Sequence, residues 1–219
     1  MTQSNESMVD YYARRAPEYE RIYEIPERQD DLQILRTKLV ELLAGRDVLE
    51  IACGTGFWTE PVSRSARSIL ATDINEEIIA IARTKKYAPA EVRFVVVDAY
   101  DLSAVRGKFD ATLAAFWWSH VPIERRESFL QALVERLHPG ARIVLCDNTC
   151  VEGESTPICR TDAQGNTYQR RTLSDGSTHE VLKNYSSEAE LRTLLDRHAG
   201  EIEYLGMRYY WCVKCRVDG

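Results

Sequence analysis

The sequence predicts an α/β fold, in which a mostly parallel β-sheet is covered by α-helices on both faces. Short apolar segments alternate with amphipathic ones at the spacing that this class of fold requires. The apolar run at 48–52 leads directly into Gly54-Thr55-Gly56, which is typical of a buried strand followed by a tight turn and a helix. With 219 residues the chain is long enough for one such domain and too short for two sizeable ones, so we expect a single domain over 1–219.

The N-terminal segment is dense in tyrosine between Tyr11 and Tyr23, after nine residues that show no pattern. Pro17 is well placed to open a short helix, and Tyr19 and Tyr23 would then share one face of it. One interpretation is an amphipathic segment that packs on the sheet domain.

The segment from 30 to 148 carries the alternation of helices and strands. Helices are expected where apolar residues recur at helical spacing, and strands where short apolar runs end in turn residues or acids. The expected helices cover 30–43, 75–84 and 124–138. The expected strands cover 48–52, 68–73, 92–98, 109–116 and 141–147.

After the fifth strand the simple alternation stops. Two polar, strand-like runs are joined through Asp175-Gly176, a hairpin signal, so we expect an inserted antiparallel hairpin or small sheet over 151–185. Ser187 and Glu190 have the spacing of a capping box that opens a helix. Strand-like runs at 201–206 and 209–217 close the chain.

Three acidic residues lie at the ends of predicted strands, around the glycine turn. Glu50 could accept a hydrogen bond from an ammonium group on a ligand. Asp73 lies where an acid can bind both hydroxyls of a ribose, and Asp98 could accept from an exocyclic amine such as that of adenine. S-adenosylmethionine (SAM) contains all three groups. The third glycine of the dinucleotide-binding fingerprint is replaced by Thr59, which disfavours NAD and FAD.

With these motifs the sequence resembles the class I SAM-dependent methyltransferases. The resemblance rests on Glu50–Gly56, Asp73-Ile74, Asp98-Ala99, Phe116–Trp118 and Leu137–Gly140. It implies SAM as the cofactor and a three-layer, Rossmann-like fold with a seven-stranded sheet whose last strand is antiparallel. The cofactor-binding residues that we expect on this basis are Tyr11, Tyr19, Glu50, Ala52, Gly54, Gly56, Trp58, Asp73, Ile74, Asp98, Ala99, Phe116 and Trp117.

The resemblance also suggests roles for the two peripheral segments. Many small-molecule methyltransferases use their N-terminal segment as a lid, so residues 1–29 are expected to cover the cofactor and the acceptor, with Tyr11 and Tyr19 as the lid contacts. The inserted segment 151–185 would shape the acceptor pocket or serve a dimer interface.

His120 is the candidate catalytic base, because it follows the fourth strand, where the family places residues that contact the acceptor. Methyl transfer from a sulfonium is an in-line displacement, so the protein mainly holds the nucleophile and the methyl group at near-attack distance. A base is needed only for an acceptor that is protonated at the working pH. The alternatives for His120 are a loop histidine held by backbone groups or a plain acceptor contact. Trp117 and Trp118 should point opposite ways, one toward the site and one into the core.

Composition argues against several classes of partner. The net charge of −6 is unfavourable for binding nucleic acid. No apolar run is long enough to span a membrane. The first residues lack the basic and apolar segments of a secretory signal, so a cytoplasmic location is expected. The six cysteines are then interpreted as free thiols in a reducing compartment.

Cys212 and Cys215 have the spacing of a metal knuckle. They lie in a run that alternates like a strand, on which residues i and i+3 point to opposite faces. We therefore expect no metal site.

The sequence leads to one main hypothesis and two alternatives. The main hypothesis is a methyltransferase that moves the SAM methyl group to nitrogen or oxygen of a small-molecule acceptor, as a monomer or homodimer, without nucleic-acid or membrane partners. The first alternative is a SAM-binding protein without transfer activity that acts as a partner or regulatory subunit. The second is a methyltransferase that acts on a protein or a carrier-bound substrate.

Overall fold

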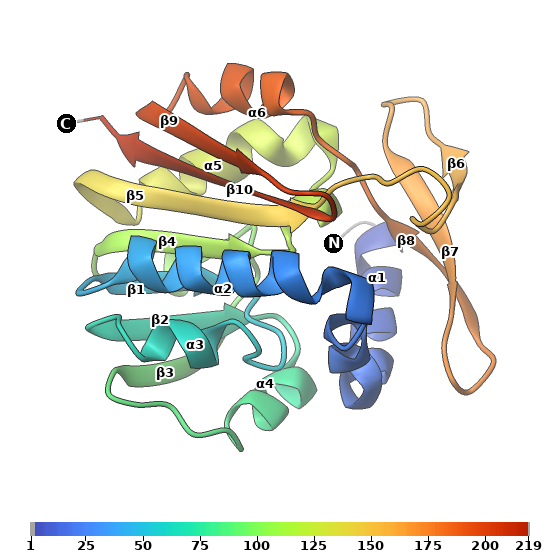
Figure 1. Cartoon of the computed structure of the whole chain (residues 1–219), viewed down its shortest axis with the longest axis horizontal. Helices are drawn as coiled ribbons and strands as arrows, with labels where there is room; N and C mark the ends of the chain where they lie inside the picture. Colours follow the sequence, from blue (N-terminus) through green and yellow to red (C-terminus); the bar gives the residue numbers. More distant parts are fainter. Residues whose placement is uncertain (1–2, 219) are drawn as a thin grey trace.

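A seven-stranded sheet forms the centre of the molecule (Figure 1), and its strand order is β3-β2-β1-β4-β5-β10-β9. The computed structural model describes residues 3–218. The first five strands in chain order pair in parallel, whereas β10 runs antiparallel to both β5 and β9. The predicted fold class is confirmed, including the antiparallel last strand. The strands are β1 Asp47–Ile51, β2 Ser68–Asp73, β3 Glu91–Val96, β4 Phe109–Ala115, β5 Leu137–Asn148, β9 Ala199–Gly206 and β10 Tyr210–Val217.

Helices cover both faces of this sheet because each carries one apolar stripe. α2 (Gln29–Leu43) and α3 (Thr59–Ser63) bury their stripes against one face, and α5 (Arg126–Val134) and α6 (Glu188–Leu195) bury theirs against the other (Figure 1). α4 (Glu76–Ala82) follows β2 and contacts β2 and β3.

The two cores lie on opposite faces of the sheet and separate the two cysteines of β10. Cys212 belongs to the core under α2 and Cys215 to the core under α5 and α6. The two sulfurs therefore point to opposite faces, as the strand pattern predicts. Among the side chains described, no group of three His, Cys, Asp or Glu residues could hold a metal ion.

The N-terminal segment forms three short helices, α1 (Gln3–Arg15), η1 (Ala16–Tyr23) and η2 (Pro26–Arg28). The helix begins within the first nine residues, where the sequence shows no pattern. Its position depends instead on tertiary contacts, because α1 packs on β8 and buries Tyr11 against Val181 of that strand.

The inserted segment is a separate three-stranded antiparallel sheet of β6 (Ile158–Thr161), β7 (Thr167–Thr172) and β8 (Thr178–Leu182). The predicted hairpin between β7 and β8 is confirmed, with Gly176 at φ +84° in its turn. The strand β6 has no counterpart in the prediction, since all four of its residues are exposed and show no alternation. This sheet lies beside α1, at the carboxyl ends of the parallel strands (Figure 1).

The helix predicted over 124–138 is too long. α5 ends at Val134, and β5 already begins at Leu137, which pairs with Phe109. The pairing then shifts by three residues in an irregular stretch that contains Gly140 at φ +76°, before Arg142 pairs with Ala111. Such a stretch accommodates Pro139 within a strand, because its missing N–H is not needed for the ladder there.

Candidate active site

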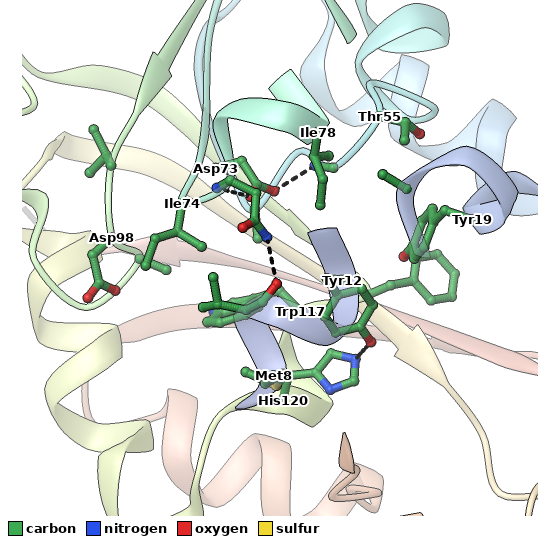
Figure 2. Close-up of a pocket in the computed structure, with 18 of the residues that line it drawn as sticks. Met8, Tyr12, Tyr19, Thr55, Asp73, Ile74, Ile78, Asp98, Trp117 and His120 are labelled. Carbon is green, nitrogen blue, oxygen red and sulfur yellow. Dashed lines mark hydrogen bonds between the residues drawn. The ribbon is translucent and has the colours of Figure 1, made fainter. Parts of the chain in front are cut away.

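A cavity of about 790 Å³ lies at the carboxyl ends of β1, β2 and β4 (Figure 2). This is the point where the strand order reverses, the position at which open α/β sheets bind their ligands. Strand ends and the loops after them form one wall, and α1 and η1 form the other with Tyr12 and Tyr19. The predicted site residues that line it are Tyr19, Ala52, Gly54, Asp73, Ile74, Asp98, Ala99, Phe116, Trp117 and His120.

The glycine turn is fastened to the end of β2 by Asp73. The Gly54 N–H donates to Asp73 Oδ2 at 3.0 Å, and the Asn75 N–H donates to Oδ1 at 3.0 Å. Burial raises the pKa of Asp73, and these backbone donors oppose that shift by favouring the carboxylate. Each oxygen keeps a further lone pair, so Asp73 can still accept hydrogen bonds from a ligand.

The backbone is strained where β1 and β4 reach the cavity. Ala52 has φ +51° and Phe116 has φ +61°, backbone angles that residues other than glycine rarely adopt. Each costs on the order of 1–3 kcal/mol, and such residues concentrate at functional sites. Both line the cavity.

Asp98 and Trp117 also line the cavity. Asp98 Oδ1 accepts from the Tyr100 N–H at 2.9 Å. The buried indole N–H of Trp117 has no hydrogen-bond partner within residues 3–218. Trp118 is buried in the core and donates to Ser186 Oγ at 3.0 Å. The two tryptophans therefore point opposite ways, as the sequence predicts.

Glu50 and Gly56 do not line the cavity. Glu50 is buried, and neither of its carboxyl oxygens has a partner in the described part of the chain. Burial raises the pKa of Glu50 to about 8. Gly56 has φ +77°, and a Cβ atom there would collide with the Tyr87 hydroxyl. The glycine at 56 thus allows this close packing.

Trp58 and Tyr11 also lie outside this cavity. The Trp58 ring stacks on Phe116 with centroids 5.6 Å apart, and its Nε1 donates to the Tyr23 hydroxyl at 3.2 Å. Tyr11 is buried against the inserted sheet with Leu173 and Val181.

Several lining residues escaped the sequence reasoning, and Tyr12 is the most informative. The sequence points to its neighbour Tyr11 equally well, because it does not set which face of α1 meets the sheet domain. The tyrosine-dense segment was the available signal, and it could not distinguish Tyr11 from Tyr12. The lining residues without a prediction are Met8, Val9, Tyr12, Ala16, Thr55, Asn75, Ile78, Val97, Tyr100 and Ala115.

His120 is held by two hydrogen bonds that fix its protonation. Its Nδ1 lies 2.6 Å from the Leu182 carbonyl oxygen, which can only accept, so Nδ1 carries the proton. Its Nε2 lies 2.8 Å from the Tyr12 hydroxyl and accepts from it (Figure 2). Burial, with the nearby charge of Lys183, lowers the pKa of His120 to about 3. The ring is therefore neutral, and its Nε2 lone pair is occupied by the Tyr12 hydroxyl at the edge of the cavity.

A buried ion pair supports the segment that carries His120. The Lys183 Nζ donates to Asp147 Oδ1 at 3.0 Å, to Ser119 Oγ at 2.7 Å and to Asn148 Oδ1 at 2.7 Å. Burial alone would raise the pKa of Asp147, but the Lys183 charge holds it below the usual value. The network ties β5, the residue that follows β8 and the short helix η4 (Trp118–His120) together.

A second, larger cavity of about 1580 Å³ adjoins the first. It lies between the N-terminal helices and the inserted sheet. Tyr12, Tyr19, Phe116 and His120 line both cavities, so the pair of Tyr12 and His120 stands where they meet.

Sequence comparisons place the chain among methyltransferases. The family described as "Methyltransferase domain" matches residues 48–140. The demethylmenaquinone methyltransferase of Clavibacter sepedonicus is 32% identical over 115 residues, which are 52% of this chain and 46% of that protein. The chain thus aligns with about half the length of that relative. The ubiquinone biosynthesis O-methyltransferase of Xanthomonas oryzae pv. oryzae is 28% identical over 186 residues, 80% of this chain and 72% of that protein.

Solved structures extend the likeness to the whole chain. DhpI in its complex with S-adenosylhomocysteine (SAH) is 28% identical in sequence and has a TM-score of 0.77. The match covers 100% of this chain and 99% of that one. The DhpI-SAM-HEP complex is also 28% identical, has a TM-score of 0.78, and the match covers 99% of both chains. With the glycine turn, the strand-end acids and the sheet order found here, these matches support a class I SAM-dependent methyltransferase with SAM as its cofactor.

Proposed function

We propose that this enzyme transfers the SAM methyl group to an oxygen or nitrogen atom of a small-molecule acceptor bound in the second cavity. The observation that carries the proposal is the pair of Tyr12 and His120, 2.8 Å apart at the junction of the two cavities. The names of the quinone-related relatives, which include an O-methyltransferase, also favour a small acceptor.

The residues of the first cavity fit SAM. Asp73 would accept from the ribose hydroxyls and Asp98 from the adenine amine, because both carboxylates keep free lone pairs there. The unpaired Trp117 N–H is a further donor toward the ligand. Glu50 does not line this cavity, so its contact with a ligand ammonium stays a prediction; such a contact would favour its ionised form despite the raised pKa.

When bound, SAM supplies a methyl group on a sulfonium centre whose sulfur departs without protonation. The protein's part is to hold the acceptor in line and to take a proton from it where one is present. His120 Nε2 would accept that proton once the Tyr12 hydroxyl releases Nε2, since Nε2 is unprotonated at neutral pH. The Tyr12 hydroxyl would exchange its bond to Nε2 for a bond to the acceptor.

The N-terminal helices are proposed as a lid. η1 is fastened to the glycine turn through Glu20, whose Oε1 accepts from Thr55 Oγ1 at 2.5 Å and pairs with Lys85. α1 is fastened to the end of β2, where Asn75 Nδ2 donates to the Val9 carbonyl at 3.4 Å. These contacts hold one wall of the first cavity.

Formation of SAH from SAM in the presence of candidate amines, phenols and acids tests the proposal. In an assay with an active acceptor, His120→Ala should lower turnover and leave the affinity for SAM unchanged. His138→Ala is the matched control, because His138 is exposed and remote from both cavities. Equal turnover of His120→Ala and the parent protein would make His120 a structural residue.

A further inference from the structure

The second cavity concentrates positive charge in a chain whose net charge is −6. One acidic residue, Glu18, is among its lining side chains. The basic residues that line it are Arg15, Arg21, Arg28, Arg170, Arg171 and Lys183.

Three of these cations are already paired with acids. Lys183 gives all three of its donors to the network around Asp147. The exposed Arg21 lies 3.7 Å from Glu18, and the exposed Arg170 lies 3.8 Å from Glu180. The positive charge of these three side chains is therefore largely neutralised by acids of the protein itself.

The other three, Arg15, Arg28 and Arg171, are half-buried and make no ion pair with any described side chain. Neutral partners hold them instead. Arg15 Nη1 donates to the Tyr11 hydroxyl at 3.0 Å, and Arg171 Nη2 donates to Gln169 Oε1 at 2.8 Å. Such contacts orient a guanidinium without neutralising it.

The charge of Arg171 acts on both side chains at the junction of the two cavities, Tyr12 and His120. Arg171 lines the same cavity as Tyr12 and His120. Burial raises the pKa of Tyr12 and the Arg171 charge opposes that shift, whereas burial lowers the pKa of His120 and the Arg171 charge adds to that shift. Like charges that are partly withdrawn from water repel one another unless a counter-charge is present. A bound anion would supply that charge.

We infer that the acceptor carries an acidic group, a carboxylate or a phosphate-like oxyanion, which Arg171 and Arg15 bind in the second cavity beside His120. The inference rests on the proposed function and names the substrate class of that same site. The planar guanidinium fork matches two oxygens of such a group. The second cavity is partly open to solvent and is large enough to admit a small molecule.

Calorimetric titration of the SAH-saturated protein with matched probes tests the inference. Benzoate and phenyl phosphate are the acidic probes, and benzamide and benzyl alcohol are the neutral ones. The acids should bind at least about tenfold more tightly than the neutral compounds, and Arg171→Gln should weaken the acids by about tenfold or more. The affinity for SAH should stay unchanged.

Arg160→Gln is the matched control. It removes the same charge from the same inserted sheet, but Arg160 pairs with Glu180 and does not line the cavity. Arg15→Gln gives an independent second variant if Arg171→Gln does not fold, and added salt should weaken the acids alone.

Three results would overturn the inference. They are failure of both acids to bind, equal affinity for acids and neutral compounds, and an equal loss in Arg160→Gln. SAH affinity separates this failure from that of the proposed function. A protein that binds SAH but not the acids contradicts the inference alone, whereas a protein that does not bind SAH contradicts the function as well.

Discussion

At the residue scale, the cofactor cavity depends on carboxylates that the backbone holds in place. Asp73 accepts from two backbone N–H groups, one in the glycine turn and one before α4, so it connects β1 and β2 at their ends. Its role could be proposed from sequence, because an acid after the second strand follows from the pattern. The hydrogen bonds that orient it come only from the folded chain.

Asp73→Ala should weaken SAH binding by about tenfold or more, since hydrogen bonds to a charged group contribute about 1.5–3 kcal/mol. Titration calorimetry measures this affinity, and thermal unfolding shows whether the variant remains folded. Asp196→Ala, at an exposed helix end far from the cavity, controls for the loss of a charge. Unchanged affinity would remove Asp73 from the site.

The low pKa of His120 predicts how stability depends on pH. The usual histidine pKa of about 6.5 applies to the unfolded chain, whereas burial lowers the pKa to about 3 in the folded protein. Between these values the unfolded chain binds more protons, so this group destabilises the fold as pH falls. Urea unfolding should show a loss of about 1 kcal/mol from this group between pH 6.5 and pH 5.5.

His120→Gln, which cannot bind that proton, should show a correspondingly shallower decline in the free energy of unfolding. His138→Gln should behave as the parent protein does, because His138 is exposed. An identical pH slope for His120→Gln and the parent would contradict the assigned neutral state.

At the element scale, the strands and the inserted hairpin follow from the sequence, but α1 does not. The strands carry apolar runs that end in acids or turn residues, and Asp175-Gly176 sets the hairpin. α1 is specified by what it contacts, since Tyr11 is buried against Leu173 and Val181 of the inserted segment. Local pattern holds no information on those partners.

Thr55→Val should loosen the lid, because it removes the hydroxyl that η1 binds through Glu20 while it keeps the side-chain volume. We expect faster release of SAH in stopped-flow experiments, by a few-fold, since a hydrogen bond to a charged group is lost. Thr193→Val on α6, remote from both cavities, is the control. A release rate equal to that of the parent would argue that this contact does not hold the lid.

At the scale of the whole molecule, two cavities meet at one pair of side chains. The first could be predicted, because parallel strands place their carboxyl ends at one edge and the glycine turn marks the strand at its centre. The second could not, since Arg15, Arg28 and Arg171 lie in three segments that only the folded chain brings together. No helix within residues 3–218 is both long and apolar enough to cross a membrane.

Titration calorimetry of the purified protein with SAM and with SAH tests the central claim most directly. Each compound should bind to one site per chain, with micromolar affinity or better. Binding would fix the first cavity as the cofactor site and justify the acceptor experiments at the second. Absence of binding by both compounds would contradict the account, because the glycine turn and the strand-end acids would then serve another ligand.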